Sequence, residues 1–432
     1  MLKRGKRVVG ALGMVAAVAF TGVLSATGSP DESSLSGWPR QMGSSEYDYI
    51  NAVATTASGD VYVAGSTDAA LSTLASAGGW DVWLARFDKF GKLKWVQQFG
   101  TAADDDVASM VVTGSSVYVV GSTGGSLAGN TASGGLDGYV ARFDTSGNSK
   151  WFRQFGTAES DEALSVAVSG RSIWVLGATS GTLPGLTSVG NGDAALLQYN
   201  SAGSLQSSRQ FGTDGYDYPN SIAVSGSTLY IGGSTAGTFA GQVNAGGTDG
   251  FLMRISNINT RRESTWVRQM GTAAADEIVG VAVSGGAVYT TGYTRGTLPD
   301  AVSAGGADGF VARYSTSGVV SWLRQFGTAA DEELNAIATV RGGVVVAGST
   351  GGAFAGFEAD SLEAFTAKFS STGAPGWLRQ FGTASTDSAV AMAIRPSDNY
   401  GGQIVVAGYT GGRLWGQAAL GKDDGFVATF LS

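Results

Sequence analysis

Short strand-like runs of apolar residues alternate with glycine-rich turns along most of the chain. In "DEALSVAVSG" (161–170), Leu164, Val166 and Val168 recur at every second position, which is the spacing of a half-buried β-strand. A Ser-Gly turn separates this run from "SIWVLGAT" (172–179), and the two runs predict a hairpin. Two further runs, "DGYVARFD" (137–144) and "WFRQFG" (151–156), are joined by a short polar turn. The pattern therefore predicts units of four short strands.

The four-strand unit repeats seven times. Each copy contains one glycine after the motif Arg-Gln-Phe or a close variant, and we call these residues the anchor glycines: Gly43, Gly100, Gly156, Gly212, Gly271, Gly327 and Gly382. A period near 56 residues without helical patterning is the size of one propeller blade. The sequence thus predicts an all-β protein, a seven-bladed β-propeller of four-stranded antiparallel blades over residues 38–432.

The two ends of the repeat region complement one another. The first ordered motif, "WPRQMG", is the fourth strand of a unit, and the final "DGFVATFLS" is the third strand of a unit. We expect the strand around Arg40 to pair with the strand around Phe426, so that the N-terminal strand closes the last blade. Closure removes the exposed sheet edges that promote aggregation.

The N-terminal segment has the pattern of a secretory signal. A basic start precedes an apolar run from Val8 to Leu24, and small residues follow. We expect a signal peptide over residues 1–26 and a polar spacer over 27–37, and hence a secreted or cell-surface protein with no membrane span after cleavage. A retained N-terminal membrane anchor is the alternative.

Composition narrows the chemistry. The 432 residues include no His and no Cys, which excludes Ser-His-Asp and Cys-His catalysis, thiolate or imidazole metal sites, and disulfides. The 27 Lys and Arg against 35 Asp and Glu give a net charge of −8, so we expect no attraction to nucleic acid. Oxygen ligands and carboxylate acid–base chemistry remain.

The motifs carry a family resemblance. Units of the form "GTAxxDE…VAVSG…VYVAGST…GGxDGFVARFDxSGxxxWxRQFG" resemble the SBBP-type bacterial β-propeller repeat. The resemblance covers the chain from Trp38 to Ser432 and implies a secreted or surface propeller. A partial similarity to the quinoprotein-type repeat covers one hairpin per blade, for example "ARFDTSGNSKW" (141–151). It leaves a cofactor-binding propeller open as a minor alternative, which a visible chromophore in the purified protein would reveal.

A carboxylate lies five residues after every anchor glycine. We call these residues the first carboxylate set: Asp48, Asp105, Asp161, Asp217, Asp276, Glu332 and Asp387. They open the innermost strand of each blade. They could form a ring of oxygen ligands for Ca²⁺ or bind a cationic partner. The interpretation we favour is that each accepts backbone N–H bonds within its own turn, because a site needs its groups at one place. No other cofactor is expected.

A second carboxylate set opens the third strand of each copy: Asp81, Asp137, Asp193, Asp249, Asp308, Glu363 and Asp424. The connections into first and third strands emerge on one side of a propeller, which we call the loop face. We expect both sets to lie there, and turn bonding is again the preferred interpretation.

Tryptophan and arginine recur two positions apart on the fourth strand. Tryptophan is found at 38, 95, 151, 266, 322 and 377, and arginine at 40, 153, 209, 268, 324 and 379. We expect each guanidinium to pack on aromatic rings and to pair with a carboxylate of the neighbouring blade. A sugar-binding platform is disfavoured, because the outer strands point in seven directions.

Specificity should depend on positions at which the copies differ. The loops between second and third strands vary, and we predict a binding rim that includes Trp80 and Trp415. The fourth copy departs most, with Tyr216 and Tyr218 beside Asp217. We therefore expect a monomeric, non-enzymatic binding or scaffold module for an extracellular protein or glycan. The alternative is an extracellular carbohydrate-active enzyme that uses a carboxylate pair.

Overall fold

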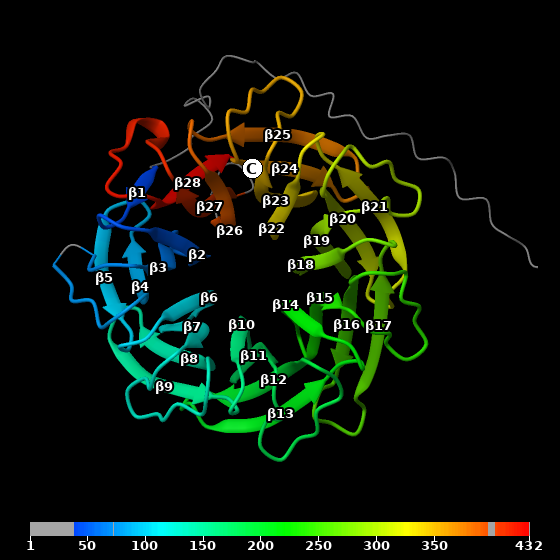
Figure 1. Cartoon of the computed structure of the whole chain (residues 1–432), viewed down its shortest axis with the longest axis horizontal. Coiled ribbons are helices and arrows are strands. Elements are labelled where there is room, and N and C mark those ends of the chain that lie inside the picture. Colours follow the sequence, from blue (N-terminus) through cyan, green and yellow to red (C-terminus); the bar gives the residue numbers. More distant parts are fainter. Residues whose placement is uncertain (1–38, 72, 396–401, 432) are drawn as a thin grey trace, which may run out of the picture.

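A computed structural model describes residues 39–71, 73–395 and 402–431 and confirms the predicted seven-bladed β-propeller. Seven four-stranded antiparallel sheets surround one axis, and the innermost strand of every blade faces that axis (Figure 1). The predicted signal peptide, the spacer and Trp38 lie outside the described residues. No helix in the described segments is long and apolar enough to cross a bilayer.

Blades 1 to 6 each run outward from the innermost strand in chain order. Blade 1 consists of β2 (Asp48–Thr55), β3 (Val61–Thr67), β4 (Asp81–Phe87) and β5 (Leu93–Phe99). Blade 2 consists of β6 (Asp105–Thr113), β7 (Ser116–Thr123), β8 (Asp137–Asp144) and β9 (Ser149–Phe155). Blade 3 consists of β10 (Asp161–Ser169), β11 (Ser172–Thr179), β12 (Asp193–Asn200) and β13 (Leu205–Phe211).

Blade 4 consists of β14 (Asp217–Ser225), β15 (Thr228–Thr235), β16 (Asp249–Ser256) and β17 (Ser264–Met270). Blade 5 consists of β18 (Asp276–Ser284), β19 (Ala287–Thr294), β20 (Asp308–Ser315) and β21 (Val320–Phe326). Blade 6 consists of β22 (Glu332–Val340), β23 (Gly343–Thr350), β24 (Glu363–Ser370) and β25 (Pro375–Phe381). Blade 7 combines β26 (Asp387–Arg395), β27 (Gln403–Thr410), β28 (Asp424–Leu431) and β1 (Arg40–Met42), with a 3₁₀ turn, η2, at Leu414–Gly416.

Strand β1 closes the ring by pairing with β28, as predicted. Arg40 pairs with Val427, Gln41 with Phe426 and Met42 with Gly425, all antiparallel. The Gln41 side chain adds to the backbone ladder, because its amide nitrogen donates to Asp424 Oδ2 and to the Gly412 carbonyl, both at 2.7 Å. In the other blades, the equivalent glutamine and carboxylate belong to one continuous stretch of the chain. In blade 7, this hydrogen bond instead joins the N-terminal strand to residues near the C-terminus.

A β-bulge interrupts every innermost strand. In β10 the register shifts between Ala163 and Ser165, so Leu164 has no opposite residue on β11. The period-two pattern through Leu164 therefore predicted the strand but missed the bulge. Equivalent shifts occur in β2, β6, β14, β18, β22 and β26. The extra residue increases the local twist of a strand close to the axis.

The hydrophobic core lies between blades. Each of seven apolar clusters combines buried side chains from two neighbouring blades; one example joins Tyr62 and Leu84 of blade 1 to Val107, Val119 and Tyr139 of blade 2. A single blade would leave both faces of its sheet uncovered. The ring therefore folds as one unit, and its strands can be apolar on both faces.

We predict that Gln41→Ala lowers the free energy of unfolding by about 1–3 kcal/mol, because the substitution removes a side-chain donor from the buried Asp424 carboxylate and leaves it only the backbone donors of Leu420 and Gly421. Urea unfolding followed by tryptophan fluorescence measures the change. Gln97→Ala is the matched control, because Gln97 is exposed on β5, and its effect should stay within about 0.5 kcal/mol. Equal stability of Gln41→Ala and the wild type would contradict a stabilising role for this contact in ring closure.

Candidate functional site

Every anchor glycine lies between two carboxylates, one from each of two neighbouring blades. A Cβ on Gly100 would overlap an oxygen of Asp81 in blade 1 and would lie 2.9 Å from an oxygen of Asp105 in blade 2. The same arrangement surrounds Gly43, Gly156, Gly212, Gly271, Gly327 and Gly382. The first and second carboxylate sets are thus brought together as seven pairs at the blade boundaries.

The first carboxylate set is buried at the start of the innermost strands. Its members are exposed by at most 1 %. Asp161 is representative: its Oδ2 accepts a backbone N–H bond from Thr157 at 2.6 Å and a hydroxyl bond from the same residue at 2.9 Å. The other six make the equivalent bond to the backbone nitrogen four residues earlier. Each side chain therefore caps its own turn.

The second carboxylate set is held by a glutamine that the sequence analysis did not single out. Gln154 donates to Asp137 Oδ2 and to the Gly125 carbonyl, both at 2.8 Å, and its Oε1 accepts from the Leu127 backbone nitrogen. The glutamines that do the same in the other blades are Gln41, Gln98, Gln210, Gln269, Gln325 and Gln380. Their recurrence before the anchor glycine was the available signal.

Several of the paired carboxylates have one oxygen without a hydrogen-bond partner among the described residues. Both partners have such an oxygen in the pairs Asp81–Asp105, Asp137–Asp161 and Asp249–Asp276. The hydroxyl of Thr123, which is paired with Asp105 across the sheet, donates to the Gly125 carbonyl and not to the free oxygen of Asp105. Glu332 is one methylene longer, and it reaches the hydroxyls of Thr328 and Thr350. Buried oxygens without partners favour uptake of a proton or a cation.

Burial raises the pKa of every first-set carboxyl group. In six of the seven, the negative charge of the second-set partner raises the pKa further, as Asp81 does for Asp105, whereas bonds from threonine or serine lower it. Among the described residues, no group of three or more acidic side chains is close enough to hold a metal ion. Ca²⁺ binding by the first carboxylate set stays a prediction.

The outer Trp and Arg residues bind the neighbouring blade, but through carbonyl groups rather than the expected carboxylates. Arg153 stacks on Trp151 at 5.5 Å, and its Nε donates to the Gly203 carbonyl of blade 3 at 2.7 Å. Arg268 and Arg324 bond in the same way to Gly318 and Gly373. Arg209 does pair with a carboxylate, Glu263, in the inserted hairpin of blade 4. Hairpin carbonyls are supplied by the backbone, so sequence did not reveal them.

Trp80 lies in an aromatic group on the loop face. Its ring stacks on Tyr49 with centroids 5.4 Å apart and planes 7° apart, and Tyr409 of blade 7 meets Tyr49 edge-on at 4.9 Å. The Tyr49 hydroxyl donates to Asp423 at 3.3 Å. Burial, followed by the Asp423 charge, raises the pKa of Tyr49 to about 12, so the phenol stays a donor at neutral pH. We call Tyr49, Trp80, Tyr409 and Asp423 the aromatic patch.

Trp415 was expected on an exposed rim, but its ring packs inward. It lies 5.4 Å from Phe381 and about 6 Å from Phe426 and Phe430, and its Nε1 is buried. Loop position alone could not distinguish an exposed ring from one that covers the core of blade 7.

A second polar group of the loop face joins blades 3, 4 and 5. The Tyr218 hydroxyl donates to Glu162 Oε2 and the Tyr293 hydroxyl to Glu277 Oε2, both at 2.7 Å. The Asn220 amide donates to Glu277 Oε1 at 2.7 Å. We call these five residues the Glu–Tyr row. Burial and the bonded glutamates raise the pKa of both tyrosines, which therefore remain protonated donors.

Comparisons with known proteins do not show a family for this chain. No family model matches the chain. The Regulatory protein FlaEY of Caulobacter vibrioides is 25 % identical in a 277-residue alignment that covers 57 % of this chain. The alignment covers only 29 % of that protein, so the chain spans less than a third of its length.

Among solved structures, the phage phi92 endosialidase has a TM-score of 0.47 at 11 % identity, with 92 % of this chain and 69 % of that chain covered. A Synechocystis apocarotenoid oxygenase mutant has a TM-score of 0.46 at 10 % identity, with 87 % and 88 % covered. These likenesses carry no argument about activity.

The carboxylate pairs predict a melting temperature that rises as the pH is lowered from neutral towards about 4. Groups with a raised folded-state pKa bind protons more tightly in the folded protein than in the unfolded chain, whose Asp and Glu values are 3.8 and 4.5. The stabilisation by these carboxyl groups is fully present at a pH below the pKa values of the unfolded chain. It is lost as the pH rises through the raised pKa values of the folded protein. Asp88, Asp144 and Glu263 have lowered pKa values and oppose this trend only below about pH 4.

Thermal melts at each pH in EDTA measure the effect. A second series with added CaCl₂ distinguishes a proton from a cation, since a cation between the carboxylates should raise the melting temperature at neutral pH. A melting temperature that falls between pH 7 and pH 5 in EDTA would contradict the predicted effect of the carboxylate pairs.

Proposed function

We propose that this chain is a secreted or cell-surface propeller of the SBBP type that binds a glycan or a protein non-enzymatically through its loop face. The motif order and the N-terminal signal pattern support the location and the family. The variation of side chains on the loop face supports the binding role, because the repeated residues are used in the blade joints.

The aromatic patch carries the proposal. The residue that follows the first-set carboxylate is Tyr49 in blade 1, but it is Asp106 in blade 2 and Glu162 in blade 3. The residue before the second-set carboxylate is Trp80 in blade 1 and Asp423 in blade 7. Positions whose residue type differs between copies therefore meet at one place, where two stacked rings lie beside a carboxylate and a phenol donor.

This arrangement favours a glycan over a flat protein surface. Aromatic rings combine a large apolar face with polar edge groups, and few side chains need to be ordered on binding. Asp423 and the tyrosine hydroxyls supply acceptors and donors for sugar hydroxyl groups. A partner protein that presents a polar, ring-like group would use the same surface.

We predict that Trp80→Ala weakens binding to the best glycan on an array at least tenfold, equivalent to about 1.4 kcal/mol, because the substitution removes one ring of the stacked pair. The melting temperature should change little, since the Trp80 side chain is only half-buried. Phe90→Ala is the matched control: Phe90 is an aromatic residue, 75 % exposed, on the β4–β5 hairpin at the opposite end of the strands. Equal binding by Trp80→Ala and the wild type would remove the aromatic patch from consideration, and absence of any glycan binding would leave only the protein class.

The Glu–Tyr row supports a second candidate, a carboxylate-dependent activity on polysaccharide. Two glutamates with separate tyrosine donors lie in blades 3 and 5, on either side of blade 4. The pKa of Tyr218, in blade 4, is raised by the charges of both Glu162 and Glu277. These Glu–Tyr hydrogen bonds distinguish this part of the ring from the other blades. Acid–base catalysis by a pair of carboxyl groups requires no histidine.

For this candidate, Glu162→Gln and Glu277→Gln should each reduce hydrolysis of a responsive polysaccharide at least a hundredfold, as expected for loss of a general acid or base. Release of reducing ends from a polysaccharide panel measures the activity. Glu159→Gln, at an exposed position of the same blade boundary, is the control. Absence of release by the wild type would eliminate the enzymatic candidate and leave the binding proposal unaffected.

A further inference from the structure

One copy of the repeat departs from the others on the outer wall of the ring. The residue three positions before the anchor glycine is arginine in blades 2, 3, 4, 5, 6 and 7, counting β1 with blade 7, but in blade 1 it is Gln97. No hydrogen bond joins the Gln97 side chain to another described residue, and the side chain is exposed. Blade 1 therefore lacks a guanidinium group that every other blade supplies.

The surroundings of the missing guanidinium are nevertheless complete. Trp95 donates from Nε1 to the Thr145 carbonyl at 3.1 Å, as Trp151 does to Ser201 and Trp322 to Ser371. Gly147 lies against the Trp95 ring, since a Cβ there would approach the indole to 2.9 Å. The matching turn glycines of blades 3, 5 and 6, Gly203, Gly318 and Gly373, have the same backbone conformation, with φ between 79° and 81° against 89° for Gly147.

The other blade boundaries show what these surroundings bind. At the boundaries of blades 2 and 3, 4 and 5, and 5 and 6, arginine Nε donates to the turn-glycine carbonyl at 2.7–2.9 Å, and Nη1 donates to the carbonyl of the residue before the arginine at 2.7–2.8 Å. The guanidinium carbon lies 5.2–5.8 Å from the tryptophan ring centre. The equivalent groups in blades 1 and 2 are the Gly147 carbonyl, the Val96 carbonyl and the Trp95 ring.

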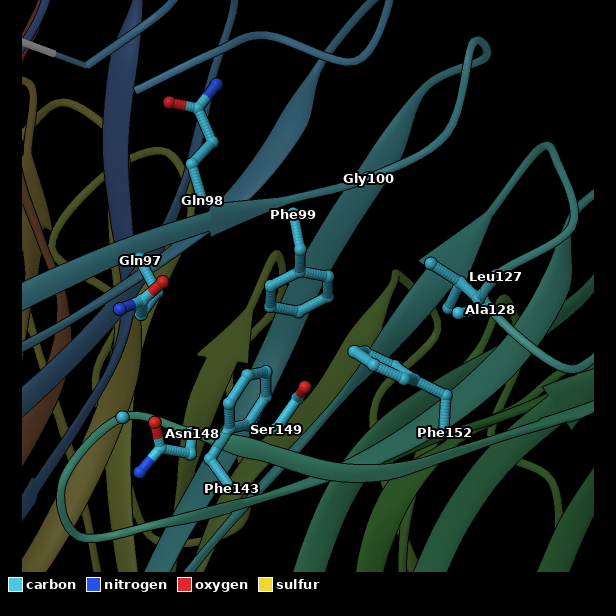
Figure 2. Close-up of a pocket in the computed structure, with 11 residues that line it drawn as sticks. Gln97, Gln98, Phe99, Gly100, Leu127, Ala128, Phe143, Asn148, Ser149 and Phe152 are labelled. Atoms are coloured by element: carbon cyan, nitrogen blue, oxygen red, sulfur yellow. The ribbon is translucent and has the colours of Figure 1, made fainter. Parts of the chain in front are cut away.

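A hollow of about 440 Å³ lies at this boundary. Gln97, Gly147 and Asn148 line one part of it, and three phenylalanine rings with centroids 5.4–5.9 Å apart line another. Figure 2 shows Phe99, Phe143 and Phe152 facing one another, with Gln97 and Asn148 together on one side. The hollow therefore borders Gln97 and Gly147, the counterparts of the arginine and of the turn glycine that bind each other in the other copies, and the Trp95 ring lies against Gly147.

We infer that this hollow is a binding site for a guanidinium group, and that its occupant is an arginine side chain of a partner polypeptide. Guanidinium is planar and weakly hydrated, so it can stack on an indole while it donates to carbonyl oxygens. Local positive charge does not exclude it: Arg86 donates to the Thr145 carbonyl beside the hollow, and Arg142 occupies the same position beside the bound Arg153. The chain as a whole carries a charge of −8, which favours approach of a cationic segment.

The direct test is a titration with the blocked peptide acetyl-Gly-Arg-Gly-amide, followed by the indole N–H resonance of Trp95, which a Trp95→Phe spectrum assigns. The Arg peptide should shift this resonance saturably, and the corresponding Lys peptide should bind at least tenfold more weakly, because a lysine ammonium cannot stack and donate to both carbonyls at once. No saturable shift, or equal affinity for the Lys peptide, would overturn the inference. Free L-arginine that binds as well as the peptide would overturn the polypeptide occupant.

Two substitutions complete the test. Gln97→Arg supplies the guanidinium from the chain itself and should abolish peptide binding. Arg153→Gln recreates the blade 1 arrangement at the next boundary and should add a second site, seen as a new saturable shift of the Trp151 indole. If Arg153→Gln does not fold, Gln97→Arg alone decides, because it restores the residue found in the six other copies. Unchanged peptide binding by Gln97→Arg would contradict the assignment of the site.

Discussion

The ring depends on the joint at each anchor glycine, where two buried carboxylates from neighbouring blades meet. Asp81 and Asp105 both approach Gly100 so closely that any Cβ would displace one of them. Each carboxylate caps its own turn, and the conserved geometry of the seven joints sets the spacing between the ends of the blades. Two like charges out of water would separate in the absence of compensation. The backbone N–H groups, the glutamine amide and the apolar clusters between blades provide that compensation.

Because this joint recurs seven times, the residues that build it are unavailable for selective binding. The carboxylate sets, the glutamines and the outer Trp–Arg pairs already form hydrogen bonds within their own blade or to the neighbouring blade. Selectivity must come from positions adjacent to the joint that differ between copies. Tyr49, Trp80 and Asp423 are such positions, and so are Glu162 and Tyr218. The loop face therefore has a repeated buried layer beneath an irregular surface layer.

The sequence was sufficient for the fold and insufficient for the contacts of single side chains. Blade number, strand order and the pairing of β1 with β28 follow from the period of the anchor glycines and from the incomplete units at the two ends. The bulge at Leu164 could not be predicted, because one extra residue in a strand leaves no mark in a period-two pattern. The carbonyl partners of Arg153 and Arg268 were missed for a related reason, since every residue carries a carbonyl group and only the fold selects which one is used.

In a repeat protein, a residue that differs in one copy can be compared with the residues at the same position in the other copies. Gln97 taken alone is an unremarkable exposed residue, but Arg153, Arg268 and Arg324 define what its surroundings can hold. The Trp95 ring and the Gly147 carbonyl are already fixed by the hairpin of blade 2 and by the Trp95–Thr145 bond, so an incoming guanidinium would not have to order them. Such preorganisation reduces the entropic cost of binding. A single Arg-to-Gln difference thereby converts a structural contact between blades into a surface prepared for the same chemical group from another chain.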